Sequence, residues 1–220
     1  CTDVREWLYN EKVEYCTWEC NGILRKCIDE VVSNAIDNAI GNDLATLIQM
    51  DVTDTSFSCL NDGVHICCND LTSSGVNSLE AAFGTLRTSS RFNETQTTIG
   101  TNGIGVKLTN IFSSTFNVQL VDENGDEKGI QWTNNMRTLS ECAVDCEVLP
   151  GSIRVFSHPD ALSTGNFGSL LSYIPWIKHR CLRDFVSAAP AIVPALSLGS
   201  GAPWCSITFD RTLPIIPQVV

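Results

Sequence analysis

Residues 26–40, KCIDEVVSNAIDNAI, carry an apolar stripe and a polar stripe at the spacing of one helix. At 100° per residue the apolar stripe consists of Ile28, Val31, Val32, Ala35, Ile36 and Ala39. The polar stripe consists of Glu30, Asn34, Asp37 and Asn38. The first stripe predicts a helix face buried in the core, which any fold of this chain must cover.

The polar stripe differs from a helix face that only meets water. Such a face usually alternates Lys or Arg with Glu, because opposite charges four residues apart support a helix. From Cys27 to Leu86 the sequence has no Lys or Arg, although it carries nine Asp and Glu residues. The stripe therefore indicates either a site for a cation, such as a divalent ion that brings phosphates, or a solvated acidic helix.

The composition limits the possible partners. A chain of 220 residues with 43% hydrophobic content can form one substantial core, and we expect a single domain over residues 1–220. A net charge of −11 argues against direct binding to a nucleic-acid backbone, so DNA contacts should come from other domains or a partner. We expect no membrane segment, because Pro190 and Pro194 interrupt the most apolar late stretch, which is too short to span a bilayer.

The eleven cysteines, at spacings that do not repeat a CxxC pair, favour free thiols in a reducing compartment. A structural zinc site on Cys16, Cys20 and Cys27 is the alternative, although no suitable His lies nearby. A disulfide scaffold fits a chain of this size less well. An intracellular protein is therefore expected.

The order of elements predicts an α/β fold. After the first helix, residues 44–52 and 55–60 form a strand pair, and residues 67–99 form a mobile polar lid around a short helical patch. A glycine-rich segment then leads into a helix, and residues 115–135 form a second strand pair. A strand at 152–157, a long helix at about 167–188 and a strand at 205–210 complete a two-layer sandwich.

The glycine-rich segment, GTNGIGVK, has the chemistry of a phosphate site. Gly100, Gly103 and Gly105 let backbone N–H groups approach an anion closely. It is not a P-loop, because Lys107 does not directly follow a glycine, and no buried strand precedes it as in a dinucleotide-binding fold. A glycine-rich turn that only begins a helix is the alternative.

Three motifs in this order, NGILRKCIDEVVSNAIDN, LRTSSRF and GTNGIGVKLTNIFSS, resemble the ATPase domain of type IIA DNA topoisomerases. They are nearer the eukaryotic, viral and large-phage branch than bacterial gyrase. The resemblance covers residues 6–210 and implies the GHKL (Bergerat) ATP-binding fold: a mixed, mostly antiparallel sheet with helices on one face. It also implies ATP and Mg²⁺ as cofactors.

The resemblance also implies roles for particular residues. Glu30 matches the general base that deprotonates the attacking water, and Asn34 matches the magnesium ligand. Asn61 matches the residue that reads the adenine amino group. The other implied nucleotide contacts are Asp37, Asn38, Asp62, Gly63, Ser89, Ser90, Arg91, Gly100, Thr101, Asn102, Gly103, Ile104, Gly105, Lys107 and Ser152.

Three positions depart from the family pattern. His65 stands where the family has a glycine after Asn-Asp-Gly-Arg, and we interpret it as a residue on the pocket rim. Arg91 stands where the eukaryotic branch commonly has Asn beside the ribose. Ser152 aligns only approximately with the strand residue that touches adenine.

The expected function is that of the ATP-driven gate of a type II topoisomerase, which dimerises with ATP in the full-length enzyme. The alternatives are another GHKL ATPase, such as a MutL-like or chaperone-like protein, and a nucleotide-binding module with little turnover. The sequence opens on Cys1 without Met and stops after the last expected strand, so we expect the upstream arm and the downstream transducer to lie outside it. The compartment would be the nucleus in a eukaryote and the cytoplasm for a bacterial or phage protein.

Overall fold

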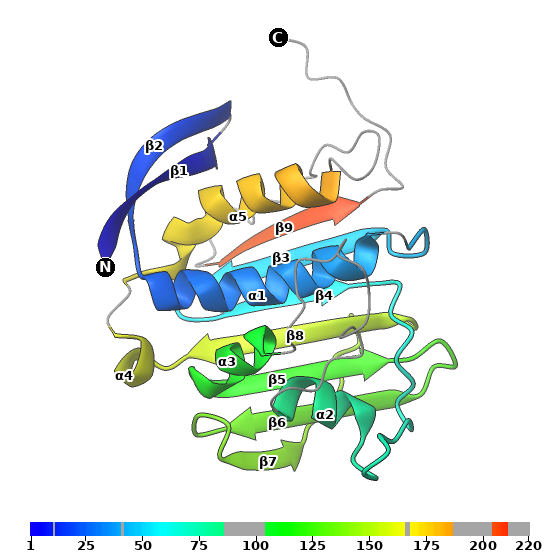
Figure 1. Ribbon diagram of the computed structural model, residues 1–220. Helices are drawn as coiled ribbons and strands as arrows, with labels where there is room; N and C mark the ends of the chain where they lie inside the picture. The colour runs from blue at the N-terminus through cyan, green and yellow to red at the C-terminus, as the bar shows by residue number, and fades with distance from the viewer. Residues whose placement is uncertain (11, 41, 86–103, 166–167, 187–203, 211–220) are drawn as a thin grey trace.

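A seven-stranded antiparallel sheet forms the centre of the computed structural model, which describes residues 1–10, 12–40, 42–85, 104–165, 168–186 and 204–210 (Figure 1). In sheet order the strands are β7 (Thr138–Glu141), β6 (Glu127–Thr133), β5 (Ser113–Val121), β8 (Ser152–Pro159), β4 (Phe57–Asn61), β3 (Leu47–Thr53) and β9 (Trp204–Asp210). Every pairing between these strands is antiparallel, so the mixed sheet of the sequence prediction is antiparallel throughout its described part.

The longer helices lie on one face of this sheet, as the two-layer prediction requires (Figure 1). They are α1 (Gly22–Ala39), α2 (Ser78–Gly84), α3 (Gly105–Ile111) and α5 (Ile174–Cys181). The 3₁₀ turn η1 (Leu170–Tyr173) precedes α5 and the π-helical turn η2 (Leu182–Val186) follows it, while α4 (Ala161–Thr164) is a single turn. The predicted helix at 167–188 is thus three successive helical pieces within its described part.

The core lies between the helices and the sheet. The apolar stripe of α1 is buried there, with Ile28 and Ile36 fully excluded from solvent. Ile48 of β3 and Phe116 of β5 join the same cluster. A second small cluster joins Leu60 of β4 and Val121 of β5 to Val148, which lies between β7 and β8.

Helix α1 begins four residues before the predicted segment. Asn21 precedes it, and its side-chain Oδ1 accepts hydrogen bonds from the N–H groups of Ile23 (3.0 Å) and Leu24 (3.2 Å). These donors have no partner inside the helix, so the asparagine sets its start. The Asn21 N–H donates to the Tyr173 hydroxyl at 2.8 Å, which ties this start to η1.

An N-terminal hairpin was not predicted. Strands β1 (Thr2–Asn10) and β2 (Lys12–Cys20) pair with each other and lie beside α5 (Figure 1). Val4, Leu8 and Trp18 pack against the core, whereas Trp7 and Tyr15 stack on the exposed side, with ring centroids 5.1 Å apart. The available signal lay in β2, where Cys16, Trp18 and Cys20 alternate with exposed Thr17 and Glu19.

The structure also bears on the predictions of free cysteines, a zinc site and a membrane segment. Cys16, Cys20 and Cys27 are free thiols. Within the described ranges no three His, Cys, Asp or Glu residues are arranged to hold a metal ion, so the zinc alternative finds no support there. No helix in the same ranges is long and apolar enough to cross a membrane.

Candidate functional site

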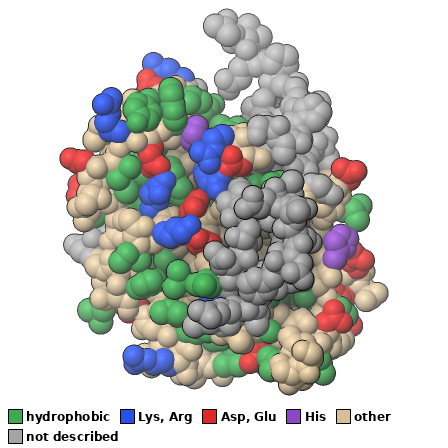
Figure 2. All heavy atoms as spheres, viewed as in Figure 1, with side chains coloured by type: hydrophobic (Ala, Val, Ile, Leu, Met, Phe, Trp, Pro, Cys, Tyr) green, Lys and Arg blue, Asp and Glu red, His purple; other side chains and the backbone are tan. Residues whose placement is uncertain are grey.

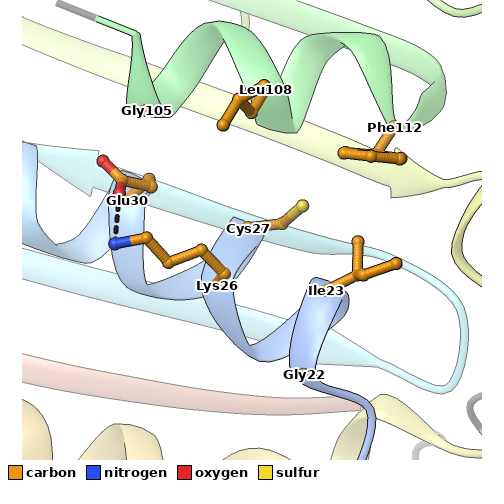
Figure 3. Close-up of a pocket in the computed structure, with 8 residues that line it drawn as sticks. All are labelled: Gly22, Ile23, Lys26, Cys27, Glu30, Gly105, Leu108 and Phe112. Carbon is orange, nitrogen blue, oxygen red and sulfur yellow. Dashed lines mark ion pairs between the residues drawn. The ribbon is translucent and has the colours of Figure 1, made fainter.

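Glu30 and Gly105, 75 positions apart in sequence, meet where α1 packs against α3. Gly105 is the first residue of α3, and Figure 3 shows the Glu30 carboxylate directed toward it. A Cβ atom built on Gly105 would overlap the Glu30 carboxylate, with Oε2 as its nearest atom. Only glycine therefore fits this position while Glu30 keeps its place. The structure brings the predicted base and the last glycine of the predicted phosphate segment together.

Lys26 was overlooked, although it stands one turn before Glu30. Its Nζ atom forms an ion pair with Glu30 Oε1 and lies 3.6 Å from Asp29 Oδ2. The hydrogen bond to Glu30 raises the pKa of Lys26, so its ammonium group stays charged at neutral pH. The four-residue spacing of a basic and an acidic residue was the signal for this pair.

Charged side chains of both signs lie close together over α1 and α5 (Figure 2). Arg180 of α5 is 8% exposed in its side chain, and its Nε atom donates to Asp29 Oδ1 at 2.9 Å. Arg25 pairs with Glu6 of the hairpin. The basic partners for the acidic part of α1 thus come partly from distant segments, a pattern that a local sequence scan cannot reveal.

A cavity of about 250 Å³ adjoins the Lys26–Glu30 pair between α1 and α3 (Figure 3). Its lining residues are Gly22, Ile23, Lys26, Cys27, Glu30, Gly105, Leu108 and Phe112. Burial raises the pKa of the Cys27 thiol to about 11, so this sulfur is a neutral wall of the cavity. This cavity could not be predicted from the sequence, because its walls come from two separate helices.

The rest of the polar stripe divides into two parts. Asn34, one turn after Glu30, is exposed, whereas Asp37 is buried. The Asn38 side chain donates to the backbone carbonyls of Asp62 (2.9 Å) and Gly63 (3.3 Å). Asn38 therefore links α1 to the turn that follows β4.

The Asp62 side chain and the Gly63 backbone also shape that turn. Asn61 is buried at the end of β4. The Asp62 carboxylate accepts hydrogen bonds from Thr46 N (2.7 Å), Thr46 Oγ1 (2.6 Å) and Leu47 N (2.7 Å), so its oxygens are already engaged. Gly63 has φ of +69°, and a Cβ there would lie 2.6 Å from Ala45 Cα. Asp62 and Gly63 thus order the turn that presents Asn61.

Two other predicted residues lie on neighbouring elements. Ser152 begins β8 and is buried, and the next residue, Ile153, pairs directly with Asn61. Lys107 lies in α3 and is 1% exposed. Burial lowers the pKa of Lys107 to about 8, because a charged ammonium loses hydration there.

His65 lies at the surface. Its Nδ1 atom is 2.7 Å from Glu123 Oε1, and both side chains are exposed. Glu123 belongs to the turn between β5 and β6. The imidazole therefore contacts a surface carboxylate, and its interpretation as a residue on the pocket rim stays a prediction.

Seven of the predicted site residues lie outside the described ranges. They are Ser89, Ser90, Arg91, Gly100, Thr101, Asn102 and Gly103. Ile104 immediately precedes α3. Of the predicted lid, residues 67–85 are described, and there Leu79 and Phe83 of α2 are buried in the core.

Comparisons with known proteins were made for the whole chain. No protein-family model matches it. It is 37% identical over 161 residues to DNA topoisomerase 2 of Invertebrate iridescent virus 6, covering 64% of this chain and 14% of that protein. It is 33% identical over 190 residues to DNA topoisomerase 2 of Candida glabrata, covering 81% of this chain and 13% of that protein. The chain thus spans a small fraction of the length of these relatives.

A solved structure shares the fold. The ATPase and transducer domains of DNA topoisomerase II from Balamuthia mandrillaris superpose with a TM-score of 0.69 at 28% identity. The match covers 82% of this chain and 50% of that one. The antiparallel sheet with helices on one face is therefore the fold of these ATPase structures.

Proposed function

Because the chain is a homologue of the ATPase region of eukaryotic and viral DNA topoisomerase II, we propose that it binds Mg-ATP and hydrolyses it. The observation that carries this proposal is the placement of Glu30 against Gly105. A carboxylate at the end of a glycine-rich segment is suited to act on water beside a bound phosphate. Neither a solvated acidic helix nor a simple helix-starting turn requires this close approach.

Glu30 acts as the general base in this proposal. Its Oε1 atom is paired with Lys26, and Oε2 is on the side of Gly105. The carboxylate accepts a proton from the water that attacks the γ-phosphate. A half-buried position suits this role, because it limits competing bulk water near the base.

Asn34 and the glycine-rich segment have the chemistry to bind a magnesium nucleotide. Asn34 is exposed one turn from Glu30 and would offer its amide oxygen to Mg²⁺. Magnesium keeps several waters and is often held by few protein ligands together with phosphates, so one amide is sufficient. When bound, the ion neutralises developing charge on the phosphates. The glycine-rich segment up to Gly105, with Thr101, Asn102, Ile104 and Lys107, would hold the phosphates.

The turn after β4 would hold the base. Asn61 would pair with the adenine amino group, while Asp62, Gly63 and Asn38 keep its turn in place. Asp37 and Ser152 would complete the adenine end. Ser89, Ser90 and Arg91 would contact the sugar and phosphates from the lid.

In the whole protein we propose that ATP binding drives two such domains together as a gate for passage of a DNA duplex. DNA would be bound by other parts of the protein, since the chain has a net charge of −11. The protein would therefore act inside the cell, where its DNA substrate is.

Calorimetric titration with ATP, with and without Mg²⁺, and phosphate release by the chain test the proposal. We expect saturable binding that is tighter with Mg²⁺, together with phosphate release. Binding without any release would support a nucleotide-binding module in place of an ATPase. Absence of binding would contradict the proposal.

A further inference from the structure

The ammonium of Lys26 lies between two carboxylates on the same side of α1. It pairs with Glu30 Oε1 and lies 3.6 Å from Asp29 Oδ2 (Figure 3 draws the first pair). A charged group with two acidic neighbours has a restricted position. Lys26 therefore offers Glu30 a fixed partner and not a freely moving one.

The two oxygens of Glu30 have different surroundings. Oε1 is engaged by Lys26, whereas Oε2 is the atom nearest to the position that a Cβ of Gly105 would take. A glutamate has three rotatable side-chain bonds, and the ion pair at Oε1 restricts that freedom. The arrangement leaves Oε2 as the oxygen on the side of the glycine-rich segment.

Buried Arg180 holds Asp29, the second acidic neighbour of Lys26. Arg180 of α5 donates from Nε to Asp29 Oδ1 at 2.9 Å and from Nη2 to Ser33 Oγ at 3.0 Å. Arg180 also pairs with Asp184. Asp29 is thus held by α5, so the row Arg180, Asp29, Lys26 and Glu30 connects α5 to the predicted base.

The Lys26–Glu30 pair is a weak contributor to folding stability. The Lys26 side chain is 58% exposed, and exposed pairs contribute little. In addition, Lys before Glu at four-residue spacing is the less favourable order in a helix. Ile23 and Phe112 line the adjoining cavity. The main consequence of the pair is therefore its effect on the carboxylate.

We propose that Lys26 is a positioning residue for the general base: held through Asp29 by Arg180, it fixes the Glu30 carboxylate with Oε2 toward Gly105. This inference rests on the proposed ATPase function. Lys26 acts through Glu30 and touches no substrate.

The test compares Lys26→Met and Lys26→Arg with the parent chain, and uses Lys128→Met as a control. Lys128 forms a similar ion pair with Glu141 on the sheet edge, away from the site. Carboxyl ¹³C NMR relaxation would report the mobility of the Glu30 side chain, and steady-state kinetics would give kcat and KM for ATP. For Lys26→Met we expect a more mobile Glu30 carboxyl group, about tenfold lower kcat and unchanged KM for ATP. Lys26→Arg should restore most of the kcat, and Lys128→Met should match the parent.

Two outcomes would overturn the inference. The first is a Glu30 carboxyl group that is equally mobile in Lys26→Met and the parent. The second is a Lys26→Met variant whose kcat equals that of an active parent chain. A parent chain that neither binds nor hydrolyses ATP would instead contradict the proposed function, and the NMR measurement would still decide whether Lys26 orders the carboxylate.

Discussion

The Glu30 carboxylate occupies the space that a side chain at Gly105 would need. The two residues come from different helices, α1 and α3, so this contact sets how closely the helices approach. It also joins the only two sequence features that separately suggested a cation site and a phosphate site. The proposed chemistry depends on this contact between Glu30 and Gly105.

Gly105→Ala should displace Glu30 and leave the fold intact. The overlapping atoms are the end of a flexible side chain, so Glu30 can move aside. We expect a fall in kcat of about 10²-fold or more, because a misplaced base loses most of its effect. Steady-state ATP hydrolysis and thermal unfolding would be measured together. Gly22→Ala is the control, since a Cβ there meets nothing within 4 Å. Equal turnover for Gly105→Ala and the parent would contradict the assigned geometry.

Gly63→Ala should destabilise the protein by about 2 kcal/mol or more, because it combines a left-handed backbone with a steric clash. The clash is with the backbone of Ala45, which cannot rotate away as a side chain does. Urea unfolding would measure the free energy of unfolding. Gly75→Ala separates the two causes, because Gly75 has φ of +78° but nothing within 4 Å. If both variants lost the same stability, the clash with Ala45 would have no part in the effect.

Asn34→Ala and Asn38→Ala should weaken ATP binding in different ways. Asn34 is proposed to meet Mg²⁺, so its loss should reduce affinity only when Mg²⁺ is present. Asn38 holds the turn after β4, so its loss should reduce affinity with and without Mg²⁺. Calorimetric titrations of both variants with ATP, in Mg²⁺ and in EDTA, provide the four affinities to compare with those of the parent. An Asn34→Ala variant whose loss is the same in both buffers would have no role at the metal.

The lowered pKa of Lys107 predicts that the free energy of unfolding rises at alkaline pH. Its pKa is about 8 in the folded chain, against an ordinary value of 10.5, so between these values the unfolded chain binds more protons. The free energy of unfolding should therefore increase as pH rises from 8 to 10.5, by at most about 3.4 kcal/mol from this group. Below pH 8 the cost of burying the charge is fully present. Urea unfolding of the parent and Lys107→Met from pH 7 to 10 measures this, and a constant difference between them would contradict it.

Much of the fold could be predicted because its elements have strong local patterns. The apolar stripe of α1 and the strand pairs β3–β4 and β5–β6 were all confirmed. β7 was missed because it is four residues long and fully exposed, so no buried alternation marks it. The hairpin of β1 and β2 was missed although its alternation was visible.

The site could be predicted less completely. The acidic face without basic residues after Cys27 marked Glu30 as a candidate, and the resemblance to the topoisomerase ATPase family supplied its role as the base. Lys26 lies just outside that basic-free stretch and was missed. The contacts of Arg180 with Asp29 and of His65 with Glu123 join residues far apart in the chain. Such contacts depend on how the elements pack, and no local spacing encodes them.

The central claim is that Glu30 is the base for ATP hydrolysis, and Glu30→Gln tests it most directly. The amide preserves the shape of the side chain beside Gly105 but cannot accept the proton of water. Phosphate release and ATP affinity would be measured for the parent and the variant, with Glu123→Gln as a control at the surface. We expect unchanged ATP affinity and a loss of turnover of about 10²-fold or more for Glu30→Gln. A Glu30→Gln variant that hydrolyses ATP as fast as the parent would contradict the account.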